Sequence, residues 1–194
     1  MRGKFIVLYG VNNLGKTTQA KMLADRLNNE GKKTEYLKYG IYNINPSGIL
    51  LNNYLREGNI YNLSPREFQI IHALNRTQYE PILKEKLNKG INIIAEDYTG
   101  TGISWGIGNG VSEKFLKTIN SHLLKEDIAF LFDGERFKES MENNHRHETD
   151  EKLTIKVRQT HLRIGVELGW KKINANLPIK KIHNIIYKEI KKII

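Results

Sequence analysis

The sequence predicts an α/β fold, with one five-stranded parallel sheet and helices on both faces. Two observations carry this prediction. Short apolar runs alternate along the chain with longer segments in which apolar residues recur at helical spacing, a pattern typical of parallel strands joined by helices. The 194 residues also contain no internal repeat, low-complexity tract or linker-like composition shift, so we expect residues 1–194 to form a single domain.

Five apolar runs are the predicted strands, and helical segments lie between them. Strands are predicted over residues 4–9, 34–39, 91–95, 128–133 and 170–174. Helices are predicted over residues 16–29, 47–57, 64–88 with a bend at Pro81, 111–124, 135–142, 151–168 and 179–192. Gly31 and Gly90 fall where the end of a helix favours a residue that tolerates a positive φ. The last helix carries isoleucines on one side, which we expect to close the core rather than to bind a membrane surface.

The composition is basic and free of cysteine. Lys and Arg number 31 against 21 Asp and Glu, and the net charge of +10 predicts a field that attracts anions such as nucleotides. No basic run is interleaved with aromatic residues, so we predict no nucleic-acid partner. No stretch approaches the roughly 20 apolar residues of a membrane span, so we predict no membrane partner. The absence of cysteine excludes disulfide scaffolds and thiolate catalysis, and we expect a cytoplasmic protein.

Residues 10–17 read GVNNLGKT, which is the pattern of a phosphate-binding P-loop: Gly, four residues, Gly, Lys, and Ser or Thr. The apolar run FIVLY leads into this loop, and a helical segment follows it. Glycines let backbone N–H groups turn toward phosphate oxygens, and the start of the helix adds partial positive charge. Lys16 would reach the β and γ phosphates, and the hydroxyl of Thr17 would ligate Mg²⁺. The loop therefore predicts a P-loop NTPase fold that binds ATP, with Mg²⁺ as cofactor.

The chain resembles the thymidylate kinases over nearly all of residues 4–188. Their opening strand, P-loop and first helix are similar to FIVLYGVNNLGKTTQAKMLADRL, and their Asn-Arg pair corresponds to Asn75 and Arg76. Their lid and the helix after it resemble HRHETDEKLTIKVRQTHL, which contains Arg146 and Glu148 in an Arg-x-Glu motif. The loop that packs against the donor adenine resembles INANLPIKKIH. The resemblance implies a nucleoside monophosphate kinase fold with a lid at about residues 143–152.

Two arginines receive roles from the resemblance. Arg76 would clamp the phosphate of the acceptor, because a guanidinium fork matches two phosphate oxygens. Arg146 in the lid would be catalytic, because phosphoryl transfer gains from positive charge placed on the equatorial oxygens. Arg136 and Lys138 are the alternatives to Arg146 in this role.

The segment after the third predicted strand departs from the family. Thymidylate kinases carry Asp-Arg followed by an aromatic or His there, whereas this chain reads Glu96, Asp97 and Tyr98. Glu96 would still be catalytic, and would bind Mg²⁺ together with Thr17. Asp97 places a negative charge where the family uses an arginine on the acceptor phosphate, and the usual arginine after the second strand is also missing, leaving Lys38. Either other cations compensate for these two missing arginines, or the acceptor differs from that of the family.

The resemblance also maps two nucleotide pockets. ATP-binding residues are predicted to be Gly10, Asn13, Leu14, Gly15, Lys16, Thr17, Thr18 and Asn176. Acceptor-binding residues are predicted to be Asn12, Lys38, His72, Arg76, Asp97, Tyr98, Thr101 and Trp105. His72 stands where an aromatic commonly stacks on thymine, Thr101 could hydrogen-bond a base edge, and Trp105 would disfavour a 2′-hydroxyl. Ordinary core packing is the competing explanation for each pocket residue.

We therefore expect a kinase that transfers the γ-phosphoryl group of ATP to a deoxynucleoside monophosphate, dTMP by resemblance. The missing arginines leave open a kinase of another deoxynucleotide or of a deoxynucleoside. Asp97 leaves open a nucleotide-binding homologue without transfer activity, and the net charge alone leaves open a nucleic-acid-associated ATPase. Family members are commonly homodimers, and an apolar face on the helix over residues 64–88 would serve as the interface.

Overall fold

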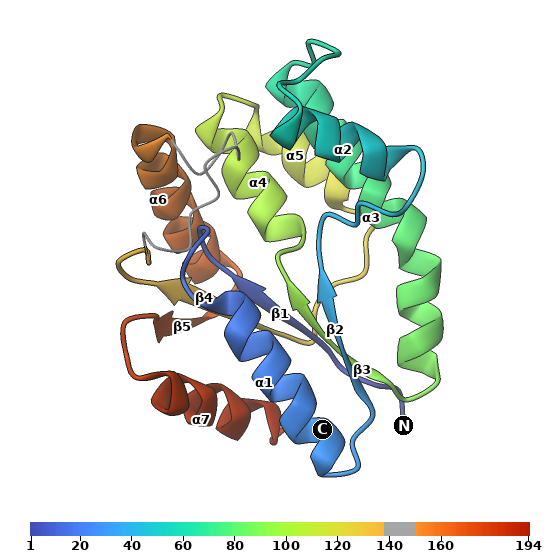
Figure 1. The fold of residues 1–194 in the computed structure, drawn as a ribbon, viewed down its shortest axis with the longest axis vertical. Helices are drawn as coiled ribbons and strands as arrows, with labels where there is room; N and C mark the ends of the chain where they lie inside the picture. Colours follow the sequence, from blue (N-terminus) through green and yellow to red (C-terminus); the bar gives the residue numbers. More distant parts are fainter. Residues whose placement is uncertain (138–149) are drawn as a thin grey trace.

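The computed structural model describes residues 1–137 and 150–194, and contains one five-stranded parallel sheet with helices on both faces (Figure 1). The strands are β1 (Phe5–Tyr9), β2 (Thr34–Lys38), β3 (Asn92–Glu96), β4 (Ile128–Asp133) and β5 (Lys171–Asn174), in the order β2-β3-β1-β4-β5. The helices are α1 (Lys16–Asn29), α2 (Ser47–Arg56), α3 (Pro65–Asn88), α4 (Thr99–Gly108), α5 (Glu113–Asn120), α6 (Glu151–Glu167) and α7 (Ile179–Ile190). The fold class and the five predicted strands are confirmed, and no strand end is off by more than one residue.

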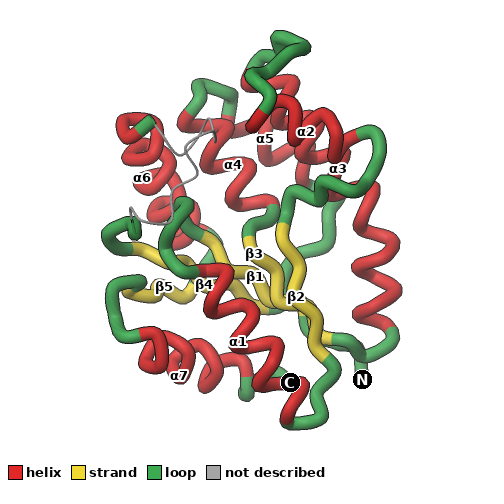
Figure 2. Tube along the Cα trace, viewed as in Figure 1, coloured by secondary structure: helices red, strands yellow, loops and turns green. Residues whose placement is uncertain are grey.

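The central strand β1 places its side chains alternately in two cores. Ile6 and Leu8 pack in a core with α1 and α7, whereas Phe5, Val7 and Tyr9 pack in a core with α3 on the opposite face. All five side chains are fully buried. Figure 2 shows this arrangement, with α1 and α7 on one side of the sheet and α3 to α6 on the other. Burial on both faces explains why the strand reads as an uninterrupted apolar run.

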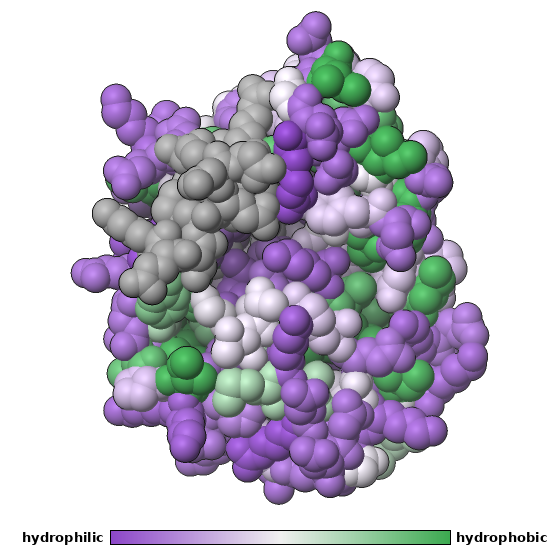
Figure 3. Space-filling view, viewed as in Figure 1, coloured by the Kyte–Doolittle hydropathy of each residue, from purple (hydrophilic) through white to green (hydrophobic). Residues whose placement is uncertain are grey.

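Helix α7 closes the first of these cores, as the sequence predicts. Ile182, Ile186 and Ile190 are buried in it, while Ile179 at the start of the helix is 57% exposed. Within residues 1–137 and 150–194, no helix is both long and apolar enough to cross a membrane. The face of the molecule shown in Figure 3 is mostly hydrophilic, with hydrophobic side chains in small groups.

Helix α4 was not predicted, because its sequence TGTGISWGIG contains four glycines, which are poor helix formers. The glycines allow other elements to approach the helix closely. A Cβ on Gly102 would lie 2.5 Å from Nη2 of Arg76 on α3, and a Cβ on Gly108 would lie 2.7 Å from the side chain of Val157 on α6. Helix α4 is therefore specified by tertiary packing, which leaves no periodic signal in the sequence.

Two other predicted helices differ from the structure. The helix predicted over residues 111–124 is the shorter α5, and the helix predicted over residues 135–142 is wrong for residues 135–137, which form a loop. That loop is held on the P-loop, because the N–H of Phe137 donates to the carbonyl oxygen of Asn13 at 2.8 Å. Residues 138–142 lie outside the described residues. Helix α3 continues through Pro81, and Gly31 and Gly90 have the positive φ values predicted for them, 76° and 79°.

We predict that Ser64→Ala lowers the free energy of unfolding by about 0.5–2 kcal/mol. The Ser64 hydroxyl caps α3 by accepting from the N–H of Glu67, whose carboxylate accepts from the N–H of Ser64 at 2.7 Å. Each 1 kcal/mol lowers Tm by about 2–4 °C in a domain of this size, so calorimetry will detect the loss. Ser112→Ala is the control, since Ser112 begins α5 without a side-chain cap hydrogen bond. Equal Tm shifts in the two variants would contradict the prediction.

Candidate active site

A cavity of about 580 Å³ opens at the carboxyl ends of β1 and β3. In open parallel sheets, ligands usually bind in the crevice at the carboxyl ends of the strands, at the point where the strand order reverses. The P-loop, the end of β2, helices α2 and α3, the start of α4 and several residues between 175 and 182 line the cavity. Its volume suits a ligand of nucleotide size.

The P-loop joins β1 to α1 through a backbone that few residues can adopt. Gly10 has φ 137°, and a Cβ there would lie 2.6 Å from the carbonyl oxygen of Phe132 on β4. Asn13 and Gly15 are left-handed, with φ 64° and 77°. Loops of this kind direct N–H groups into a concave anion site, beside the unsatisfied N–H groups at the start of the helix. The loop is therefore shaped to accept phosphate oxygens.

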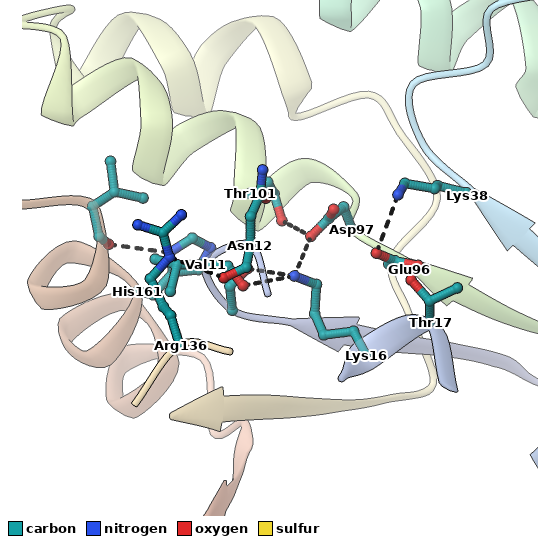
Figure 4. A network of polar contacts seen from close by, with 12 residues as sticks. Val11, Asn12, Lys16, Thr17, Lys38, Glu96, Asp97, Thr101, Arg136 and His161 are labelled. Atoms are coloured by element: carbon teal, nitrogen blue, oxygen red, sulfur yellow. Dashed lines mark hydrogen bonds and ion pairs between the residues drawn. The ribbon is translucent and has the colours of Figure 1, made fainter. Parts of the chain in front are cut away.

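Lys16, in the first turn of α1, is held over the P-loop. Its Nζ donates hydrogen bonds to the carbonyl oxygens of Gly10 at 2.9 Å and Val11 at 2.8 Å, and lies 3.7 Å from Oδ1 of Asp97 (Figure 4). The side chain is only 3% exposed. The structure thus places the ammonium group where the motif predicts the donor phosphates.

Glu96, the last residue of β3, accepts two hydrogen bonds and forms one ion pair. Thr17 Oγ1 donates to its Oε2 at 2.6 Å, the hydroxyl of Tyr36 donates to the same oxygen at 2.8 Å, and Nζ of Lys38 lies 3.5 Å from Oε1. Burial alone would raise the pKa of Glu96, but attraction to Lys16 and Lys38 and the two hydroxyl hydrogen bonds hold the pKa below its ordinary value. Glu96 is therefore ionised at neutral pH, beside the hydroxyl of Thr17.

Asp97 follows β3 in a left-handed conformation with φ 62°. Its Oδ1 accepts a hydrogen bond from Thr101 Oγ1 at 2.9 Å. Burial raises the pKa of Asp97; the positive charge of Lys16 opposes this rise, and the negative charge of Glu96 adds to it. The carboxylate offsets part of the charge of Lys16. It also accepts a hydrogen bond from the hydroxyl of Thr101, the residue that the resemblance offers as a contact for the base of the acceptor.

Arg76 on α3 is a buried cation of the same cavity, with 3% of the residue exposed. Its Nη1 donates to Oδ1 of Asn120 on α5 at 3.0 Å, whereas its Nε has no partner among the described residues. Within residues 1–137 and 150–194, no carboxylate forms an ion pair with it. Burial lowers the pKa of Arg76, while three nearby tyrosine hydroxyls and Asp97 act to raise it. A guanidinium remains charged in such surroundings, so Arg76 offers a full positive charge to a ligand.

Most predicted site residues lie together in the cavity wall. The wall includes Asn12, Asn13, Leu14, Gly15, Lys16, Thr17, Thr18, Lys38, His72, Arg76, Glu96, Asp97, Tyr98, Thr101 and Trp105. Asn176 is placed differently: its side chain accepts from the N–H of Glu135 at 2.7 Å and donates to the carbonyl oxygen of Glu135 at 3.0 Å. The neighbouring Ala175 and Leu177 line the cavity instead.

The predicted catalytic Arg146 and the lid up to residue 149 lie outside the described residues, as does Lys138. Arg136, the other alternative to Arg146, lies beside the P-loop. Its Nε donates to the carbonyl oxygen of Asn12 at 3.3 Å (Figure 4). The segment that leads toward the lid thus brings a positive charge to the P-loop.

Two side chains that organise the site were missed from the sequence. Tyr36 is two residues before Lys38 on β2, so the alternation of a strand puts both on one face, and that spacing could have identified it. Asn120 gives no such signal, because it contacts Arg76 across 44 residues of sequence. The other missed residues of the cavity wall include Tyr42, Leu55, Arg56, Phe68, Gln69 and Phe137.

His161 on α6 is a buried neutral histidine in the neighbourhood of Lys16 (Figure 4). Its Nδ1 donates to the carbonyl oxygen of Val157 at 3.0 Å, and its Nε2 has no partner among the described residues. Burial lowers the pKa of His161 to about 3, and the positive charge of Lys16 acts in the same direction. His161 therefore adds no positive charge beside Lys16 at neutral pH.

The fold and the site together define a P-loop kinase. A glycine-rich loop follows the central parallel strand, an ionised carboxylate lies beside the loop threonine, and a buried arginine lines the same cavity. The family model described as thymidylate kinase matches residues 8–186. The chain therefore belongs to the thymidylate kinase family.

Individual relatives agree with this assignment. The thymidylate kinase of Dictyostelium discoideum is 30% identical over 188 residues, covering 95% of this chain and 83% of that protein. The human thymidylate kinase is 26% identical over 190 residues, covering 95% of this chain and 88% of that protein. A solved structure of thymidylate kinase from Candida albicans superposes with a TM-score of 0.80 at 22% identity, covering 98% of this chain and 92% of the other. This last similarity supports the fold.

We predict that His161 makes the protein less stable in acid. Its pKa is about 3 in the folded chain and about 6.5 in an unfolded one, so only the unfolded chain takes up a proton between these values. Stability is therefore lost as pH falls from about 6.5 toward 3, by about 1.4 kcal/mol per pH unit from this group. Denaturant unfolding of wild type and His161→Gln across this range should show that the free energy of unfolding falls less steeply with decreasing pH in the variant. Exposed His122→Gln is the control, and parallel profiles for wild type and His161→Gln would refute the prediction.

Proposed function

We propose that this protein transfers the γ-phosphoryl group of ATP to dTMP, giving ADP and dTDP. Membership of the thymidylate kinase family supports the reaction. The observation that carries the proposal for this chain is the single cavity, which joins the P-loop and Lys16 to the buried Arg76. Donor and acceptor sites that share one cavity allow the two reacting groups to be brought in line, which is the main requirement of phosphoryl transfer.

On the donor side, the P-loop N–H groups and Lys16 bind the phosphates of ATP. Ala175, Leu177, Ile179 and Ile182 give the cavity an apolar wall, which suits the adenine ring. Asn176 supports that wall by fixing residues 175–177 against the backbone of Glu135. Catalysis then rests on positioning and on positive charge from Lys16, with Arg146 added from the lid by resemblance.

The residues present fit a magnesium ion. The hydroxyl of Thr17 and the ionised carboxylate of Glu96 are hard oxygen donors that lie 2.6 Å apart beside the P-loop. Magnesium in such sites is held by one or two carboxylates together with substrate phosphates. Thr17 and Glu96 would therefore hold Mg²⁺, which when bound neutralises charge on the β and γ phosphates.

On the acceptor side, Arg76 favours a monophosphate over an uncharged nucleoside. Burying a charge without a partner is costly, and Arg76 has no carboxylate partner among the described residues, so an anionic ligand supplies the missing counter-charge. Asn12, Lys38, His72, Tyr98, Thr101 and Trp105 complete the acceptor side of the cavity.

Asp97 is the observation that favours a second candidate, a kinase whose acceptor is a nucleotide other than dTMP. Its carboxylate lies 3.7 Å from Nζ of Lys16, in the place where family members carry a cation for the acceptor phosphate. An acceptor nucleotide whose base is bound more strongly than thymine would compensate for the loss of this cation.

The exposed side chains of α3 and the absence of cysteine bear on the oligomeric state and the cellular location. Ile70, Leu74 and Ile82 on α3 are exposed hydrophobic residues, which supports a homodimer through this helix. The cysteine-free sequence is that of a protein that uses no disulfides, which supports a cytoplasmic location.

We predict that Lys16→Ala lowers kcat by about 10²-fold or more, because a charge at the transferring phosphates is lost. Coupled measurement of ADP release gives the rate, and far-ultraviolet circular dichroism checks that the variant is folded. Undiminished turnover in the folded variant would refute the assigned role of Lys16.

The acceptor is tested with a panel of deoxynucleoside monophosphates, ribonucleoside monophosphates and nucleosides, each scored for ADP release. We expect dTMP to give the highest kcat/KM. A higher value for another nucleotide would replace dTMP with that acceptor, and turnover of nucleosides alone would refute a monophosphate kinase. ATP binding without turnover of any acceptor would identify a non-catalytic homologue.

A further inference from the structure

The hydroxyl of Tyr36 on β2 holds the carboxylate of Glu96 at the end of β3. It donates to Oε2 of Glu96 at 2.8 Å, and Thr17 Oγ1 on α1 donates to the same oxygen at 2.6 Å. A tyrosine hydroxyl keeps its proton at neutral pH, and an ionised carboxylate can only accept, so the direction of both hydrogen bonds is fixed. The elements β2, β3 and α1 are therefore joined at one carboxylate oxygen.

The pairing of β2 with β3 brings Tyr36 to this carboxylate. In the register of the two strands, Lys38 is the partner of Glu96 and Tyr36 is the partner of Ile94. The ring of Tyr36 packs against the buried core that contains Ile94, and Nζ of Lys21 on α1 lies 5.7 Å from the centroid of the ring. The ring is therefore held by contacts that do not involve its hydroxyl.

Lys38, the other residue of β2 that contacts Glu96, restrains the carboxylate less. Its Nζ lies 3.5 Å from Oε1, and its side chain is 54% exposed, whereas that of Glu96 is 7% exposed. Ion pairs with an exposed lysine are screened by solvent and contribute little. Hydrogen bonds to an ionised carboxylate are stronger than neutral ones, and the hydroxyl of Tyr36 brings no charge that would offset the carboxylate. Tyr36 thus fixes Glu96 and leaves its negative charge for a cation.

The carboxylate held by Tyr36 in turn orients the hydroxyl of Thr17. A hydroxyl has one proton to donate and two lone pairs that can accept. Because the proton of Thr17 is donated to Glu96, the lone pairs of its oxygen remain for a cation beside the P-loop. Rotation of Glu96 away from Thr17 would remove this orientation, and the hydrogen bond from Tyr36 opposes that rotation.

We propose that Tyr36 is a positioning residue for the magnesium site, which holds the carboxylate of Glu96 and through it orients the hydroxyl of Thr17. Tyr36 does not line the active-site cavity in the described part of the chain, so it acts through Glu96. Groups that hydrogen-bond to metal ligands typically contribute about 10- to 100-fold to metal affinity. The proposal rests on the proposed function, because it assumes that Thr17 and Glu96 hold Mg²⁺.

The test is Tyr36→Phe, which removes the hydroxyl and keeps the ring. The probe is Mn²⁺, titrated into protein saturated with a non-hydrolysable ATP analogue, with free Mn²⁺ measured by electron paramagnetic resonance. We expect Tyr36→Phe to weaken Mn²⁺ binding about tenfold. Affinity for the ATP analogue in EDTA should change less than twofold, because the P-loop and Lys16 bind the phosphates without the metal.

Tyr187→Phe is the matched control. The hydroxyl of Tyr187 on α7 also donates to a carboxylate, that of Glu30 at 2.7 Å, and the guanidinium of Arg26 lies over its ring. Neither Tyr187 nor Glu30 lines the active-site cavity, so we expect unchanged Mn²⁺ affinity in this variant. A merely structural contribution of Tyr36 would weaken binding of the ATP analogue in EDTA as much as binding of Mn²⁺, which would overturn the proposal.

A double-mutant cycle shows whether Tyr36 acts through Glu96. In a Glu96→Ala background, Tyr36→Phe should cause no further loss of Mn²⁺ affinity, whereas an additive loss would overturn the proposal. Unchanged Mn²⁺ affinity in Tyr36→Phe itself would also overturn it, while leaving the proposed function intact. The proposed function is decided separately by turnover of the acceptor panel with wild-type protein, so the two failures are distinguished.

Discussion

The active site depends on one steric constraint, which is that the chain must leave β1 without a side chain at residue 10. The carbonyl oxygen of Phe132 on the adjacent strand occupies the space that a Cβ on Gly10 would need. The loop that follows therefore closes over the end of the central strand, and α1 begins there. Because β1 pairs with β3 with Leu8 opposite Glu96, the same turn brings the hydroxyl of Thr17 against the Glu96 carboxylate. The donor side of the site follows from the geometry of this turn.

Two groups of charges in the cavity have different surroundings. Lys16 lies 3.7 Å from Asp97 and Lys38 lies 3.5 Å from Glu96, so these two cations and two carboxylates largely offset each other. Arg76 stands apart, held by an amide rather than by a carboxylate. Arg76 thus keeps a positive charge that no carboxylate among the described residues pairs with.

The features that could be predicted from the sequence are those encoded by residues close together in the chain. Apolar runs located the five strands, and the spacing GVNNLGKT located the P-loop, because both depend on neighbours in the chain. Helix α4 and Asn120 could not be predicted, since the first is specified by close packing at its glycines and the second by a contact across 44 residues. The acceptor residues were predicted from family resemblance. Arg76 and Asp97 do line the cavity, but the resemblance gave no sign that Asp97 would accept a hydrogen bond from Thr101.

The glycines of α4 also limit how the range of acceptors could be engineered. Pockets are usually narrowed by enlarging side chains on the helices around them, and widened by trimming them. At Gly102 there is no side chain to remove, and a methyl group there would lie 2.5 Å from Nη2 of Arg76, so any enlargement would displace the guanidinium. Changes in acceptor size can instead be sought at Leu55, Phe68 and His72, which line the same cavity and carry side chains that can be altered. Directed evolution of this enzyme should therefore concentrate its substitutions in α2 and α3.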